Sequence, residues 1–291
     1  MTIIVEGDRI PLRNVLYLTD FSEPSEAALP FAVAIANDYG ARVHALHVLT
    51  PVIPETCPEA IQADEVLANA EMAKVDSQLT GVPHDTATAR GVGLRPAVEH
   101  AIHERNIDRI VLGTHGRSRA QKLLLGSFAE EIFRRSSVPV LTIGPHVPKN
   151  VITNGAFHSV LFATDFSEPC KAAAPFAVSL AEENDAHLIL LGVAPKPGTT
   201  EASELAVADA IQGLNDIVPT DARRWCRPTP IVQHGDAADR ILGVATARGA
   251  DLIVLGVRDA AGHLGTATHL ERATAHKVLA HARCPVLTVR D

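Results

Sequence analysis

Short apolar runs alternate with longer amphipathic stretches along the whole chain. In the first half, these runs predict strands over 14–20, 42–49, 84–90, 108–114 and 138–143. The first, fourth and fifth runs are continuously apolar, which is typical of strands buried on both faces of a parallel sheet. The longer stretches between them predict helices. This alternation favours the α/β class, with an open parallel sheet, right-handed crossovers and helices on both faces.

The first predicted helix has clear signals at its start and along one face. Ser22 suits the N-cap position, and Pro24 suits the first turn. The apolar positions expected on the buried face, at helical spacing, are Ala27, Phe31, Ala34 and Ile35. Pro30 lies inside the helix and removes one backbone donor, so a kink is expected there.

The two halves of the chain repeat one another. Residues 18–33 (LTDFSEPSEAALPFAV) and 163–178 (ATDFSEPCKAAAPFAV) match at twelve of sixteen positions. Two later landmarks, IVLG and PVLT, recur in the same order at nearly the same spacing. A repeat of this length indicates duplication of a whole domain, not a solenoid. We therefore expect two domains, 1–146 and 147–291, joined by a short linker near Pro145–Phe157.

Composition excludes several classes of function. The chain has 291 residues, of which 46% are apolar, and its formal net charge is −8. Such an acidic chain is poorly suited to broad contact with nucleic acid or anionic lipid. The N-terminus lacks the pattern of a signal peptide, and no apolar run is long enough for a bilayer helix. The four cysteines are scattered, which is typical of free thiols in the cytoplasm.

A glycine-rich loop follows the fourth predicted strand. Gly113, Gly116 and Gly126 are separated by two and nine residues, and Ser127 follows the last of them. Gly113 is expected to turn the chain off the strand, and Gly116 to let the backbone approach a ligand. A helix beginning at Gly126–Ser127 would point free N–H groups at an anion, and Arg117 adds positive charge. This spacing predicts a phosphate-binding loop, although the chain contains no GxxxxGK(S/T) pattern.

Four segments together resemble a known family. They are TDFSEP after the first strand, LHVL in the second, the glycine-rich loop, and VPVLTI in the last. This combination resembles the universal stress protein family over essentially the whole chain, twice. The resemblance implies two tandem Rossmann-like domains, each with a five-stranded parallel sheet of strand order 3-2-1-4-5. It also implies ATP binding, because members with the G-2x-G-9x-G-(S/T) pattern bind ATP.

Carried over position by position, the resemblance implies an ATP site at this loop. Leu18, Thr19 and Asp20 would line the adenosine pocket. Val48 would contact the adenine. The residues that would hold the ribose and phosphates are Gly113, Gly116, Arg117, Gly126, Ser127 and Phe128. His115 lies inside the loop and either contacts the ligand or forms the loop tip.

Asp20 has two interpretations. A carboxylate at the carboxyl end of a strand suits hydrogen bonds to the ribose or the base, or a Mg²⁺ shell; a helix cap is the alternative. The sequence leaves open whether ATP is bound with Mg²⁺. We predict no metal site made by histidines, because His44 and His47 lie three apart in one strand and point to opposite faces.

The second copy retains some residues of the predicted site but not the glycine spacing of the loop. Asp165 and Gly256 are retained, but Asp259 stands where the first copy has Gly116. An aspartate there adds a β-carbon and a negative charge where phosphate would lie. Gly265–Thr266 resembles the end of the loop but comes too early in register. We therefore expect one ATP per chain, bound by the first copy.

These observations favour a cytoplasmic stress-response module that signals through nucleotide occupancy. We find no catalytic residues, so any hydrolysis should be slow, and whether the protein is an enzyme stays open. The alternatives are a nucleotide-free interaction scaffold and an ATP-consuming adenylyl or phosphoryl transferase. The resemblance implies pairing through the closing strands, 138–143 and 285–290, so that the chain forms an intrachain pseudo-dimer. A homodimer and an unidentified protein partner also stay open.

Overall fold

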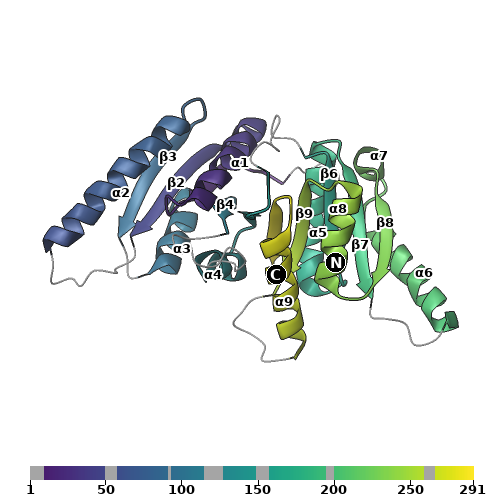
Figure 1. The fold of residues 1–291 in the computed structure, drawn as a ribbon. Coiled ribbons are helices and arrows are strands. Elements are labelled where there is room, and N and C mark those ends of the chain that lie inside the picture. The colour runs from purple at the N-terminus through teal and green to yellow at the C-terminus, as the bar shows by residue number, and fades with distance from the viewer. Residues whose placement is uncertain are drawn as a thin grey trace. The chain divides into compact units, whose positions relative to one another are not determined.

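The structure, a computed structural model, describes most of the chain in two compact units (Figure 1). The described residues are 10–49, 58–90, 93–114, 127–148, 157–194, 200–258 and 266–291. The first unit is built from Pro11–Pro145, and the second mainly from 157–291. Each unit therefore corresponds to one copy of the sequence repeat.

The first unit alternates strands and helices as the hydrophobic pattern predicts. Its elements are β1 (Asn14–Leu18), α1 (Glu23–Tyr39), β2 (Arg42–Leu49), α2 (Pro58–Gln78), β3 (His84–Arg90), α3 (Leu94–Arg105), β4 (Arg109–Gly113), α4 (Ser127–Arg135) and β5 (Val140–Ile143). The strands pair in parallel in the order β3-β2-β1-β4-β5. Right-handed crossovers place α1 and α2 on one face of this sheet and α3 and α4 on the other.

The second unit has the same arrangement. Its elements are β6 (Ser159–Thr164), α5 (Glu168–Glu183), β7 (His187–Ala194), α6 (Thr200–Ile217), α7 (Arg223–Cys226), β8 (Thr229–His234), α8 (Ala237–Arg248), β9 (Leu252–Val257), α9 (Thr266–His281) and β10 (Val286–Arg290). Its parallel strands follow the order β8-β7-β6-β9-β10, which is equivalent to that of the first unit. The short helix α7 is an addition before β8, and it exposes Trp225.

The central strands form the core of each sheet. In the first unit, β4 is buried along its whole length, and β1 is buried from its second residue onward. The outer strand β3 is only half-buried. The prediction that the continuously apolar runs are buried on both faces is therefore confirmed.

The prediction for α1 is correct at its start and partly wrong along its face. Ser22 is the N-cap, and its side chain accepts a hydrogen bond from the Ser25 N–H. Phe31 and Ile35 are buried, but Ala27 and Ala34 are only half-buried. The residues that complete the buried face are Ala28, Leu29, Ala32 and Ala36. The helix is rotated by about one position, and it continues through Pro30, which is exposed.

A carboxylate in front of the fourth strand anchors the first strand in both units. The Asp108 carboxylate accepts hydrogen bonds from the N–H groups of Arg13 and Asn14, at 2.7 and 2.8 Å. In the second unit, Asp251 accepts from the N–H groups of His158 and Ser159, at 2.7 and 2.9 Å. This contact holds the first and fourth strands together, and their far ends carry the candidate site.

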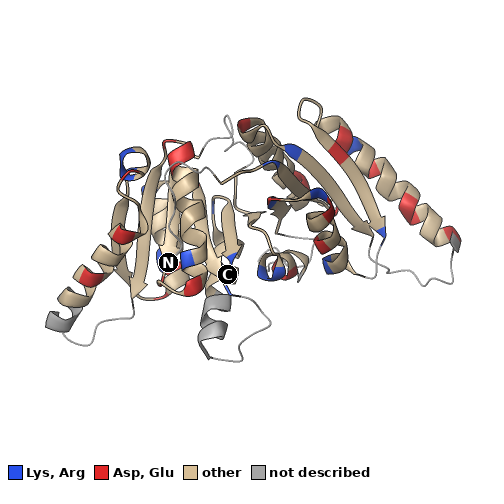
Figure 2. Ribbon diagram, turned by 180° about the vertical axis from the view of Figure 1, so that it is seen from behind, with Lys and Arg blue, Asp and Glu red and all other residues tan. Residues whose placement is uncertain are grey.

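The surface of α2 is acidic (Figure 2). Its acidic residues are Glu59, Asp64, Glu65, Glu71 and Asp76. The same helix exposes Val66 and Leu67. A surface with this charge would repel the phosphate groups of nucleic acid.

Candidate functional site

A small pocket lies where β1 and β4 end. Its lining residues are Leu18, Asp20, Ser25, Gly113, Thr114, Phe128 and Ala129. They come from three segments: the end of β1 with the start of α1, the end of β4, and the first turn of α4. Ligands on open parallel sheets bind at the carboxyl ends of strands where the strand order reverses, and β1 and β4 form that position here.

Four residues chosen from the sequence meet in this pocket. They are Leu18, Asp20, Gly113 and Phe128. Sequence reasoning missed Ser25, Thr114 and Ala129. Thr114 directly follows Gly113, is fully buried, and donates its N–H to the Ile143 carbonyl at 3.1 Å. Adjacency to a predicted residue was the only available signal for it.

The remaining loop residues fall at or beyond the edge of the described structure. His115, Gly116, Arg117 and Gly126 lie outside the described residues. Ser127 is described only as the first residue of α4. A helix does begin where the sequence places one, and a helix start is a favourable position for an anion.

Thr19 and Val48, both assigned to the site from the sequence, are absent from the pocket lining. The Thr19 side chain is buried, and its hydroxyl lies 3.1 Å from that of Ser25. The same oxygen accepts a hydrogen bond from the Phe21 N–H at 3.0 Å. Val48 is half-buried near the end of β2. The Thr19 side chain thus organises the turn after β1.

The Asp20 carboxylate closes a tight turn. Its Oδ1 accepts hydrogen bonds from the Ser22 N–H, at 3.1 Å, and from the Ser22 hydroxyl. The N-cap itself is Ser22, so capping is not the role of Asp20. Asp165 repeats the contact with the Ser167 N–H at 2.9 Å. Burial opposes ionisation of Asp165, but hydrogen bonds from Ser167 outweigh it and lower the pKa below its usual value.

Gly113 has a packing role that the sequence did not predict. It is the last residue of β4, and a β-carbon there would lie 2.2 Å from the carbonyl oxygen of Pro24. Gly256 has the same relation to Pro169, at 2.4 Å. The segment over which the chain leaves the strand, from His115 onward, lies outside the described residues, so the expected turn stays a prediction. The glycine is needed because the start of α1 packs directly on the strand backbone.

The second unit differs at the corresponding position. Cys170 replaces Ser25; it is buried, and burial raises the pKa of its thiol. When Pro139 and Pro285 are aligned, Ala273 corresponds to Ser127, but α9 already begins at Thr266. Asp259 and Gly265 lie outside the described residues. The corresponding residues of the first unit, 120–126, belong to the predicted glycine-rich loop and lie outside the described residues.

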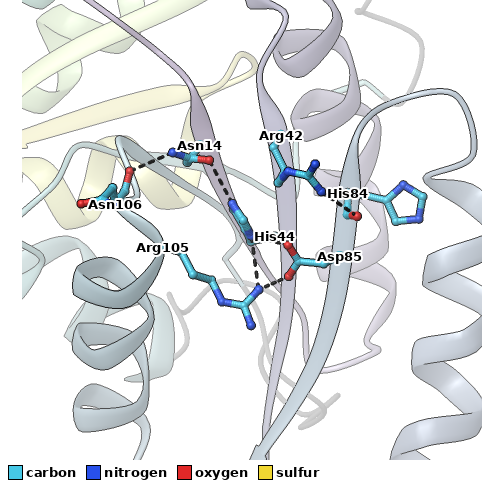
Figure 3. Close-up of polar contacts among 7 residues, drawn as sticks. All are labelled: Asn14, Arg42, His44, His84, Asp85, Arg105 and Asn106. Carbon is cyan, nitrogen blue, oxygen red and sulfur yellow. Dashed lines mark hydrogen bonds and ion pairs between the residues drawn. The ribbon is translucent and has the colours of Figure 1, made fainter.

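A polar cluster lies at the opposite, amino end of the first sheet (Figure 3). Buried His44 has its Nδ1 2.7 Å from Asp85 Oδ2 and its Nε2 3.1 Å from Asn14 Oδ1. The Arg105 guanidinium contacts Asp85 and approaches His44 Nδ1 to 3.2 Å. Burial, together with the charges of Arg105 and Arg42, lowers the pKa of His44 to about 4. The cluster links β1, β2 and β3 to the last residue of α3.

Comparison with known proteins decides the family. The model of the universal stress protein family matches residues 11–144 and again 156–290. This chain belongs to the universal stress protein family. The two matches confirm a tandem member with two family domains in one chain.

Individual universal stress proteins each resemble about half of the chain. One from Methanocaldococcus jannaschii is 28% identical over 151 residues, covering 49% of this chain and 87% of its own length. Another, from Thermus aquaticus, is 30% identical over 136 residues, covering 45% and 98% respectively. A universal stress protein structure from Archaeoglobus fulgidus covers 95% of this chain and 96% of its own, with a TM-score of 0.66 and 24% identity. The last comparison supports the fold.

Neither a metal-binding cluster nor a membrane-spanning helix is found among the described residues. They contain no group of three or more His, Cys, Asp and Glu side chains that could hold a metal ion. They also contain no helix with the length and apolar character needed to cross a bilayer.

Three of the four cysteines, Cys170, Cys226 and Cys284, are buried free thiols, and Cys57 lies outside the described ranges.

Proposed function

We propose that this universal stress protein binds one ATP in its first unit and acts as a nucleotide-dependent regulatory module in the stress response. The observation that carries the proposal is the convergence of Leu18, Asp20, Gly113 and Phe128 in one pocket. These residues come from separate segments of the chain, and the sequence resemblance assigns all of them to the nucleotide site. The pocket also lies at the edge of the sheet where nucleotides bind in related architectures.

Each part of the site has a proposed task. The loop between Gly113 and Ser127 carries backbone N–H groups and basic side chains for the phosphates. Asp20 supplies a fixed carboxylate for ribose hydroxyls. A Mg²⁺ ion bound with the nucleotide would neutralise phosphate charge, and Asp20 is the carboxylate in the pocket lining that could support its hydration shell.

We propose that the second unit does not bind ATP. The functional division then follows the domains 1–146 and 147–291, with an intact loop in the first and a degenerate loop in the second. Asp259 places a negative charge where Gly116 stands in the first copy. The start of α9 at Thr266 supports this asymmetry, because the corresponding positions of the first copy belong to its predicted phosphate-binding loop.

Isothermal titration of the full chain with ATP tests the proposal. We expect one nucleotide per chain and a loss of at least about tenfold in affinity for Gly116→Asp. The matched control is Gly265→Asp, which changes the second copy and should leave affinity unchanged. A stoichiometry near two contradicts the asymmetry. A titration with ATP that shows no binding contradicts nucleotide recognition and leaves an interaction scaffold as the function.

Signalling through occupancy requires slow turnover. We propose hydrolysis far below about one per second, the lower end of the usual enzyme range. Nucleotide binding would then order the loop and change which surfaces a partner protein meets. Measured turnover above that rate would instead indicate an ATPase or a transferase.

We also propose a cytoplasmic location and an intrachain pseudo-dimer of the two copies. The tether between the copies gives each a high effective concentration for the other. Light scattering of the full chain, with and without ATP, distinguishes this monomeric arrangement from a homodimer of tandem chains.

A further inference from the structure

The turn after the first strand has the same backbone in both units. Phe21 and Phe166 occupy equivalent positions in the TDFSEP motif, and both are left-handed, with φ of 60° and 63°. Each donates its N–H to the threonine two residues earlier, at 3.0 Å to Thr19 Oγ1 and 2.9 Å to Thr164 Oγ1. A left-handed phenylalanine is uncommon, so the turn is held by specific contacts.

The two phenylalanine rings nevertheless lie in different surroundings. The Phe21 ring packs against His47, with ring centroids 4.3 Å apart. In the second unit, the residue equivalent to His47 is Gly192. The Phe166 ring lies instead near Gly213 of α6, where an added β-carbon would be 3.1 Å from the ring, and Phe166 is 39% exposed.

His47 reaches from β2 to the turn after β1. Its imidazole is buried, and Nδ1 lies 2.8 Å from the Thr19 carbonyl oxygen. Because a carbonyl only accepts hydrogen bonds, Nδ1 carries a hydrogen and donates it. His47 therefore binds the carbonyl of Thr19 and contacts the ring of Phe21 at the same time.

The second unit is an internal control for the role of this histidine. The left-handed turn forms there with Gly192 in place of His47, so the backbone turn does not require the imidazole. Two features are found only in the unit that has His47: the Phe21 ring packs against the imidazole, and the Thr19 carbonyl accepts a hydrogen bond from it. Both lie beside Asp20 and Val48, where the adenosine part of the ligand is expected.

We infer that His47 is a positioning residue for the adenosine side of the nucleotide site in the first unit. The inference rests on the proposed ATP binding. His47 donates to the Thr19 carbonyl and packs against the Phe21 ring, so that this wall is formed before the nucleotide binds. Preorganisation of this kind increases affinity because less ordering is required on binding. The second unit has Gly192 in place of His47 and therefore lacks this preorganised wall.

Binding of ATP and of inorganic triphosphate separates this role from a general structural one. His47→Gly reproduces the second unit, and we expect it to weaken ATP binding by about five- to tenfold. Binding of inorganic triphosphate, measured by competition with ATP, should stay within about twofold, because the phosphate loop is untouched. His47→Asn keeps a donor near the position of Nδ1 and should recover most of the ATP affinity. Phe166→Ala is the matched control in the second unit and should not change either affinity.

The outcomes distinguish this inference from the proposed function. If wild-type protein binds no ATP, the proposed function and the inference both fail. If wild-type protein binds ATP and His47→Gly binds it equally well, only the role of His47 fails. An equal loss of ATP and triphosphate binding in His47→Gly also overturns the inference, because it indicates a structural effect on the whole site. Circular dichroism of each variant verifies that the fold is intact.

Discussion

The backbone of Pro24 lies directly against Gly113, and a β-carbon on that glycine would be 2.2 Å from the Pro24 carbonyl oxygen. Real β-carbons do not approach a backbone atom so closely. The first turn of α1 therefore rests on the last residue of β4 without a side chain between them. Gly256 and Pro169 repeat the relationship in the second unit, where Asp259 stands at the sequence position of Gly116. Retention of Gly256 is thus evidence of packing and not of ligand binding.

We predict that alanine at either glycine destabilises the protein. Gly113→Ala and Gly256→Ala should each lower the free energy of unfolding by about 2–3 kcal/mol, because α1 or α5 must shift away from the strand. Gly243→Ala is the matched control: it lies in helix α8 with open space around the added carbon. It should stabilise the protein by up to about 1 kcal/mol. Urea unfolding measures all three, and an unchanged stability for Gly256→Ala would contradict the packing argument.

The cluster around His44 predicts a dependence of stability on pH. The pKa of His44 is about 4 in the folded protein, against 6.5 for an ordinary histidine. Between these values the unfolded chain binds a proton at this position that the folded chain does not bind. This contribution to stability is therefore complete above pH 6.5 and is lost as pH falls toward 4. A loss of about 2–3 kcal/mol is expected over this window.

Two variants isolate this contribution from other titrating groups. His44→Ile places the residue that the second unit has at the equivalent position, Ile189. Its free energy of unfolding should fall less between pH 6.5 and 4 than that of the wild type. Arg105→Gln removes a nearby positive charge, which should raise the pKa of His44 and reduce the pH dependence. Parallel pH profiles for the wild type and His44→Ile, measured by urea unfolding, would rule out this assignment.

The anchor formed by Asp108 should matter more than its surface position suggests. Its carboxylate accepts two backbone hydrogen bonds at the start of β1. Asp108→Ala should destabilise the protein by about 2 kcal/mol, because two N–H groups lose a charged acceptor. Asp251→Ala should have a similar effect through the second unit. Asp38→Ala, on the exposed side of α1, serves as control and should change stability by less than about 0.5 kcal/mol. Equal effects of Asp38→Ala and Asp108→Ala would contradict the anchor.

Local patterns in the sequence were sufficient for the elements and the fold class, whereas the strand order came from the resemblance to the universal stress protein family. The strands β2 and β3 begin and end at the predicted residues, 42–49 and 84–90, because runs of apolar and alternating residues determine strand position directly. The duplication was equally visible, because it appears when the chain is compared with itself. The motif at Thr19–Asp20 and the glycine spacing also predicted a site at the carboxyl edge of the sheet, where Leu18, Asp20 and Gly113 line one pocket.

Contacts between distant segments were decided only by the tertiary structure. Ser25, Thr114 and Ala129 join the pocket because α1, β4 and α4 converge there, and no spacing along the chain encodes that convergence. The need for glycine at position 113 comes from Pro24, which lies far from it in sequence. The alternation of apolar and polar positions that marks the buried face of a helix or strand, by contrast, has a regular period that is visible in the sequence. A sequence therefore determines which elements form, whereas side-chain partnerships depend on how those elements pack.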